Sequence, residues 1–130
     1  MHKNYLAIAA FFGGLAVALG AFGAHGLQKI TSDAAILHSY NTGVQYQMYH
    51  SLGLLGVAVL FEKFSSRWLR WVANCFITGI ILFSGSLYLL TMLKIQGVST
   101  KWVGPITPAG GLFFIAGWLL LFIAVTRKNS

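Results

Sequence analysis

The chain has 130 residues, of which 57% are hydrophobic and only 8% are charged, and its formal net charge is +7. A soluble domain carries about 25% charged residues, so this composition excludes an ordinary soluble globular domain and predicts an integral membrane protein. The single cysteine, Cys75, excludes a disulfide framework and a multi-cysteine metal site. The basic residues lie between apolar blocks and form no single patch, which argues against nucleic-acid binding.

Four apolar stretches are long enough to cross a bilayer, which takes about 20 residues. They cover about residues 5–24, 42–61, 71–93 and 106–125, and none contains Lys, Arg, Asp or Glu. Because the connections between them are short, we expect the spans to pack as sequential antiparallel neighbours. The prediction is an all-α integral membrane protein, a single domain over residues 1–130 with four transmembrane helices in an antiparallel up-down bundle.

The distribution of basic residues predicts the orientation of the chain. Six of them lie on the side of the two termini and the middle loop: Lys3, Lys63, Arg67, Arg70, Arg127 and Lys128. Three lie on the opposite side: Lys29, Lys94 and Lys101. The positive-inside rule therefore places both termini and the middle loop in the cytoplasm.

The second helix is expected to begin before the bilayer does. Thr31 and Ser32 are good N-caps, and Asp33 in the first turn suits the positive end of the helix dipole. No proline follows between Asp33 and Phe61, so one helix of about 44 Å is feasible.

A polar run, GVQYQMYHS at residues 43–51, interrupts this second span. Gly43, Tyr46, Gln47 and His50 recur at spacings of three and four, so they share one helix face, which we expect to point into the bundle. If the hydrocarbon begins near residue 42, His50 lies about 12 Å inside the membrane.

The other spans offer polar partners at a similar predicted depth. Ser84 and Tyr88 are one turn apart on the third span, Thr107 is a candidate N-cap of the fourth before Pro108, and the first span ends outward at His25. The predicted cluster in the outer half of the bundle comprises His25, Tyr46, Gln47, His50, Ser84, Tyr88 and Thr107. The glycines predicted to allow close helix packing are Gly20, Gly23, Gly43, Gly53, Gly85, Gly110, Gly111 and Gly117. We expect the inner half to be apolar.

Four motifs, in this order, carry a resemblance to a known family: GAFGAHGL at residues 20–27, TGVQYQMYH at 42–50, LFSGSLY at 82–88 and TPAGGLFFIAGW at 107–118. Together they resemble the YgdD/YwdK-like family, small bacterial inner-membrane proteins of unknown function with mitochondrial relatives. The resemblance covers nearly the whole chain and implies a multi-pass protein of the bacterial cytoplasmic membrane. It carries over no activity and no mechanism.

Two interpretations of the polar cluster stand first. The side chains can simply form hydrogen bonds between helices, which is a structural or interaction role. Alternatively, since ionisable residues inside membranes often mark functional sites, the cluster can be a small-solute, lipid or proton-linked site open to the outer face, with His50 as the titrating group.

Two further interpretations have less support. A metal or haem site on His25 and His50 lacks the carboxylates or thiolates that would complete a ligand set. An enzyme using Ser84, His50 and Tyr88 lacks an acid to orient the histidine. We therefore expect no enzyme activity, no metal and no cofactor. The expected partners are the lipid bilayer and a second copy of the chain, because a bundle this small encloses little volume.

Overall fold

The computed structural model describes residues 1–127, and Lys128, one of the basic residues counted above, lies outside them. The described residues form helices and no strand. In chain order these are α1 (Lys3–Phe22), the π-helical turn η1 (Gly23–Leu27), α2 (Gln28–Ile30), α3 (Ala34–Leu60), α4 (Ser66–Gly79), the π-helical turn η2 (Ile80–Ser84), α5 (Gly85–Ile95) and α6 (Ile106–Thr126).

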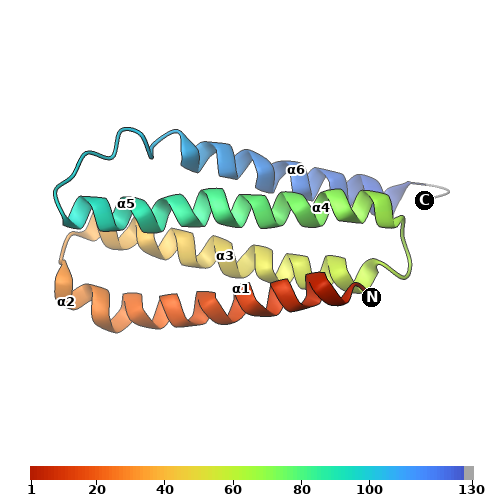
Figure 1. Ribbon diagram of the computed structural model, residues 1–130, viewed down its shortest axis with the longest axis horizontal. Helices are drawn as coiled ribbons and strands as arrows, with labels where there is room; N and C mark the ends of the chain where they lie inside the picture. Colours follow the sequence, from red (N-terminus) through yellow and green to blue (C-terminus); the bar gives the residue numbers. More distant parts are fainter. Residues whose placement is uncertain (128–130) are drawn as a thin grey trace.

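These elements make four long helical rods. The first runs without a break over Lys3–Ile30, and the third runs over Ser66–Ile95. Each rod is antiparallel to the one before it, and both ends of the chain lie at the same end of the molecule (Figure 1). The fourth predicted span, residues 106–125, matches α6 to within one residue. The first and third helices extend beyond their predicted spans.

The second rod, α3, begins close to the expected residue, but its cap differs from the predicted one. Asp33 is itself the N-cap, and its Oδ1 accepts hydrogen bonds from the backbone N–H groups of Ala35 and Ile36. Thr31 Oγ1 instead accepts from the N–H of Asp33, at 3.2 Å. Asp33 takes the cap because its backbone is extended while its carboxylate reaches the first-turn N–H groups.

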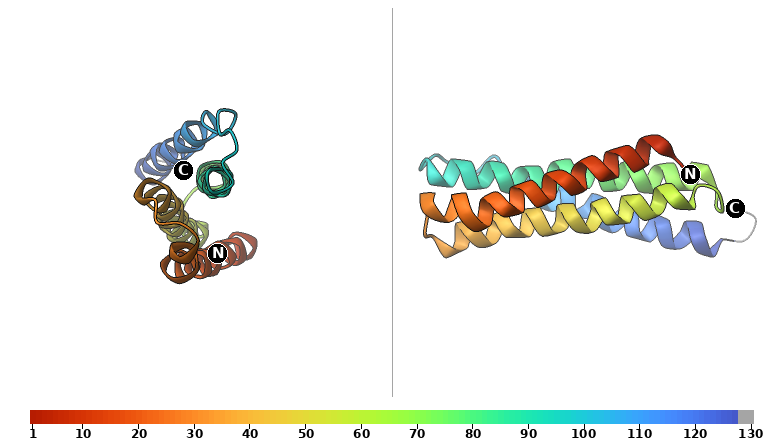
Figure 2. Two further views of the ribbon diagram at one scale, coloured as in Figure 1. Left: turned by 90° about the vertical axis from the view of Figure 1, so that its left-hand side faces the viewer. Right: turned by 90° about the horizontal axis from the view of Figure 1, so that it is seen from below.

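The four rods form an open, curved row (Figure 2). α3 packs against α1 on one side and against α4, η2 and α5 on the other, whereas α6 packs mainly on α4 and η2. α1 and α6 therefore lie at the two ends of the row. This arrangement leaves α3 in a central position with helices on both sides.

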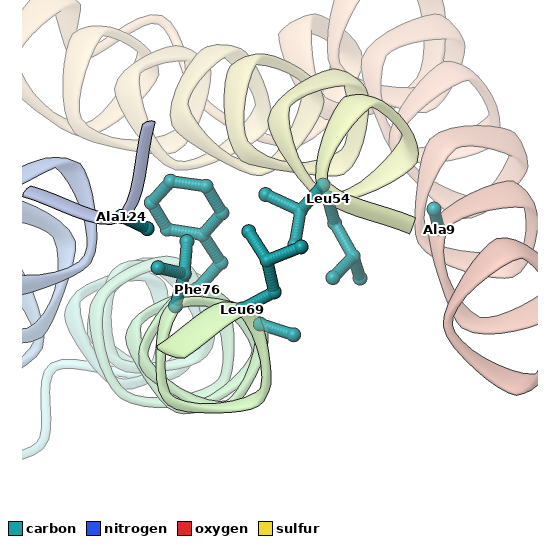
Figure 3. Close-up of a cluster of buried hydrophobic side chains, with 8 residues drawn as sticks. Ala9, Leu54, Leu69, Phe76 and Ala124 are labelled. Carbon is teal, nitrogen blue, oxygen red and sulfur yellow. The ribbon is translucent and has the colours of Figure 1, made fainter. Parts of the chain in front are cut away.

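An apolar core fills the half of the molecule that holds the chain termini, as the sequence predicts. Phe76 of α4 lies between α3 and α6, and Leu54 and Leu69 occupy the space between α3 and α4 (Figure 3). The buried members of this core are Ala9, Leu54, Val57, Leu69, Val72, Ala73, Phe76 and Ala124. Between membrane helices such a core stabilises by van der Waals packing, because lipid tails are as apolar as these side chains.

Among the described residues, three helices are long and apolar enough to cross a membrane: Lys3–Ile30, Ser66–Ile95 and Ile106–Thr126. α3 has 27 residues and sufficient length, but its polar run makes it less apolar than the other three. α3, which is less apolar than the other three rods, is thus also the central rod.

Candidate functional site

The side chain of Gln47 connects three helices. It lies on α3 and is 2% exposed. Its Nε2 donates to the backbone carbonyl of Phe12 on α1 at 2.8 Å, and its Oε1 accepts from the hydroxyl of Tyr88 on α5 at 2.6 Å. Both ends of the amide are therefore used.

One turn earlier on α3, Gly43 brings the backbones of two rods together. The hydroxyl of Ser84 donates to the carbonyl of Gly43 at 2.7 Å. A Cβ at Gly43 would come within 3.1 Å of the Tyr88 ring and 3.2 Å of the Leu87 Cβ. Only a glycine allows this approach without displacing a neighbour.

One turn later, His50 uses both ring nitrogens. Nδ1 lies 2.7 Å from the carbonyl of Tyr46, and Nε2 lies 3.0 Å from the indole Nε1 of Trp118 on α6. A carbonyl requires a donor and an indole N–H requires an acceptor, so these partners assign the neutral tautomer with the proton on Nδ1. The imidazole also stacks on Phe114, with ring centroids 3.5 Å apart.

A separate pair of hydroxyls joins α5 to α6. Ser86 donates to the carbonyl of Phe83, so the hydroxyl of Thr107 is the donor in the bond between Ser86 and Thr107. Thr107 is not the N-cap that the sequence suggested. α6 begins at Ile106 after Pro105, and the Thr107 hydroxyl bonds to the neighbouring helix instead of capping its own.

The structure brings five of the seven predicted site residues into hydrogen bonds between helices: Gln47, His50, Ser84, Tyr88 and Thr107. We call these five, together with Gly43, Ser86 and Trp118, the polar network. Tyr46 contributes only its backbone carbonyl to it, and its side chain is 38% exposed.

His25 lies apart from the network. It is exposed on η1, where Gly23 packs against Tyr40 and Asn41 near the start of α3. His50 is ten residues beyond Tyr40, which corresponds to about 15 Å along the helix. The structure therefore does not bring the two histidines together. Within residues 1–127, no group of three or more His, Cys, Asp or Glu side chains is placed to hold a metal ion.

The network runs from mid-length of the helices toward the end opposite the termini, where Thr107 lies in the first turn of α6. Gln47 is at the middle of α3, and its partner Phe12 is at the middle of α1. His50 and Trp118 lie slightly closer to the end that holds the termini. The members Gly43, Ser84, Ser86 and Tyr88 lie between mid-length and the end opposite the termini. The depth of the network in the membrane stays a prediction.

The predicted packing glycines differ in how closely neighbours approach them. An added Cβ at Gly110 would overlap the backbone of Phe83, and one at Gly117 would overlap the ring of Phe76. An added Cβ at Gly23 would overlap the ring of Tyr40 as closely, and contacts with less overlap occur at Gly20, Gly43 and Gly53. At Gly111 the atom nearest to an added Cβ would be 3.8 Å away, and at Gly85 nothing would lie within 4 Å. Neither of these two glycines is therefore needed for close helix packing.

Two aromatic residues of α6 were missing from the predicted site. Trp118 and Phe114 are one helical turn apart, and both contact His50. An indole N–H within an apolar span needs an acceptor, which is a signal that the sequence contains. The sequence does not say which of the polar residues supplies that acceptor.

Beside His50, a groove of about 550 Å³ separates α3 from α6. We call it the aromatic groove. Its lining residues are Tyr46, Tyr49, His50, Phe83, Gly111, Phe114, Ile115 and Trp118. Tyr49, Ile115 and Trp118 are exposed at mid-length of the helices, so the groove opens to the side of the molecule. This differs from the expected site open to the outer face.

Every buried side-chain nitrogen and oxygen in the described part of the chain has a hydrogen-bond partner. The polar network is therefore complete without a ligand. The aromatic groove offers apolar surface, since both nitrogens of His50 are already bonded.

Comparison with known proteins gives the family. Residues 19–111 match the family described as a protein of unknown function (DUF423). The chain is 42% identical to the UPF0382 membrane protein YwdK of Bacillus subtilis, over 96% of this chain and 98% of the relative. It is 41% identical to the UPF0382 inner membrane protein YgdD of Escherichia coli K12, over 94% of this chain and 88% of the relative. No solved structure matches. With this agreement over nearly its whole length, the chain belongs to the UPF0382 (DUF423) family of membrane proteins of unknown function.

Proposed function

We propose that this protein is a non-enzymatic, multi-pass protein of the bacterial inner membrane that binds an apolar group from the bilayer in the aromatic groove. In this proposal α3 crosses the membrane with the other three rods, and both termini are cytoplasmic. The polar network holds α3 in place as one wall of the groove.

A structural role for the polar network is supported by its complete hydrogen bonding. Gln47 bonds on both sides, and so does His50. Hydrogen bonds between membrane helices contribute about 0.6 kcal/mol each on average, so several of them are needed to fix a helix as polar as α3. Its position between α1 and α4–α5 lets the polar side chains find partners away from lipid.

Proton-linked chemistry at His50 has less support. A second proton would have to go on Nε2, where it would face the indole N–H of Trp118. Two donors would then oppose each other at 3.0 Å inside an aromatic environment. Enzyme chemistry has even less support, because the hydroxyl of Ser84 bonds to the Gly43 carbonyl and not to a base.

The observation that carries the binding proposal is the aromatic groove itself. Its volume of about 550 Å³ falls in the range of ligand sites, roughly 300–1,000 Å³. Its walls are the rings of Tyr46, Phe83 and Phe114, and it opens sideways, which in this proposal is toward the lipid chains. An acyl chain or a similar apolar group fits this chemistry, whereas a polar solute would find few unused hydrogen-bonding groups there.

Substitution of Gly111 by leucine tests the proposal. A Cβ at this position meets no atom closer than 3.8 Å, and Gly111 lines the groove, so the larger side chain should occupy groove volume. Gly14→Leu is the matched control, because Gly14 also has open space and lies on α1. Native mass spectrometry of protein purified in mild detergent should show a stoichiometric apolar adduct in wild type and Gly14→Leu, and none in Gly111→Leu. Equal adducts in all three proteins, or none in any, would overturn the binding proposal.

Homo-oligomerisation remains a prediction. It is supported by the small size of the chain and by the position of α1, which packs chiefly on α3 at one end of the row. Chemical cross-linking in native membranes should then give a dimer or a larger species, and recovery of monomer alone would count against it.

A further inference from the structure

A second groove lies at the end of the molecule that holds both termini, between the start of α4 and the end of α6. It has a volume of about 450 Å³ and is lined by Arg67, Trp68, Trp71, Leu120 and Arg127. We call it the arginine groove. On α6, Leu120 and Trp118 are two residues apart, about 200° around the helix, so the arginine groove and the aromatic groove lie on different faces of α6.

The two arginines are available for a ligand. The guanidinium carbon of Arg127 lies 4.5 Å from the centre of the Trp68 ring, which holds this side chain over the groove by a cation–π contact. Neither arginine side chain makes a hydrogen bond or a salt bridge within residues 1–127. The acid nearest in sequence, Glu62, is bonded to the N-terminal amino group at 2.7 Å.

The groove changes in character along α6. Arg127 lies two turns beyond Leu120, a rise of about 10 Å. The charged end and the apolar end of the groove are therefore separated along the helix axis. Trp71 is 60% exposed beside the apolar end. Tryptophan is enriched where acyl chains meet headgroups, and such a gradient matches the order of groups in a phospholipid.

The start of α4 adds a second favourable feature. Ser65 stands at the N-cap, but its side chain makes no capping hydrogen bond. The first-turn N–H groups and the positive end of the helix dipole therefore remain available to an anion beside Arg67.

We propose that the arginine groove binds the phosphate of an anionic phospholipid, with an acyl chain along Trp71 and Leu120. A planar guanidinium can donate two parallel N–H bonds to phosphate oxygens, and basic pockets between membrane helices suit such headgroups. The apolar end of the groove favours a lipid over free phosphate. This inference does not rest on the proposed function, because it involves a different face of α6.

The test uses the full chain in nanodiscs of phosphatidylcholine and phosphatidylglycerol. Native mass spectrometry should show phosphatidylglycerol enriched over phosphatidylcholine among the retained lipids. The double variant Arg67→Gln/Arg127→Gln should lower this enrichment by about tenfold, because two charge-assisted phosphate contacts are lost. The control Lys63→Gln/Arg70→Gln removes the same charge at the same end of the molecule without touching the groove, and it should keep the enrichment.

Two results would overturn the inference. An equal loss in both double variants would mean general attraction to a basic surface. Displacement of the lipid by inorganic phosphate alone would mean that the ligand is free phosphate. Size-exclusion profiles and thermal unfolding of both variants establish that each one is folded, so that a lost adduct reports binding and not misfolding.

Discussion

The indole N–H of Trp118 donates a hydrogen bond to Nε2 of His50 across the space between α6 and α3, at 3.0 Å. The two rings also contact Phe76, which belongs to the apolar core. One bond thus connects the polar network to the core and forms part of the aromatic groove. α6 otherwise packs mainly on α4 and η2, so this bond is a direct link from α6 to the central helix.

Replacing Trp118 by phenylalanine should destabilise the protein, because Nε2 of His50 loses its donor in an apolar surrounding. The expected loss is about 1–3 kcal/mol in the free energy of unfolding. Unfolding of the purified protein in mixed micelles measures it. Trp71→Phe is the control, since Trp71 is 60% exposed and makes no hydrogen bond within residues 1–127. Equal stability of the two variants would contradict a structural role for the bond.

Gln47→Leu should have a similar or larger effect. The substitution leaves the Tyr88 hydroxyl without its acceptor and removes the bond to Phe12, at a cost of about 1–3 kcal/mol. Gln45→Leu, at an exposed position two residues earlier, should change stability by about 0.5 kcal/mol or less. The same unfolding assay compares them. A stability of Gln47→Leu equal to that of Gln45→Leu would show that the network does not hold α3.

Much of this fold follows from the sequence, because three spans are long and apolar enough to be recognised by themselves and α3 has sufficient length. The polar face of α3 also follows from helical spacing. That face is broad, however. Relative to Gly43, Tyr46 lies about 60° to one side and Gln47 about 40° to the other, so spacing alone cannot say which edge is buried. In the structure Gln47 is buried and Tyr46 lines the aromatic groove.

The partners on other helices were harder to predict. Which residue of α6 meets His50 depends on the register between rods, and the π-helical turn η2 changes that register within the third rod. A hydropathy profile of the sequence does not show this change of register. The prediction of Thr107 as a helix cap was wrong for a different reason. A hydroxyl near a helix start can bond either to its own backbone or to a neighbouring helix, and in the structure it bonds to the neighbouring helix.

Gly110→Ala should destabilise the contact between α6 and η2. Its Cβ would overlap the backbone of Phe83, which cannot rotate away, so one helix must shift at a cost of about 1–3 kcal/mol. Gly111→Ala is the neighbouring control. Its Cβ has room at 3.8 Å, and the higher helix propensity of alanine should leave the protein equally or more stable, by up to about 1 kcal/mol. Thermal unfolding of the two variants gives the comparison, and a loss at Gly111 as large as at Gly110 would contradict the packing described.

The proposed topology can be tested with three serines at exposed positions, Ser32, Ser66 and Ser99, each changed to cysteine in a Cys75→Ser background. Ser32 precedes α3, Ser66 begins α4, and Ser99 lies between α5 and α6. If α3 crosses the membrane and both termini are cytoplasmic, a membrane-impermeant maleimide added to intact spheroplasts should label positions 32 and 99. Position 66 should be labelled only after the membrane is opened.

Labelling of positions 32 and 66 from the same side would mean that α3 does not cross the membrane. α3 is the helix in which polar residues replace part of the apolar span. The reverse pattern, with 66 labelled from outside, would invert the orientation that the basic residues predict.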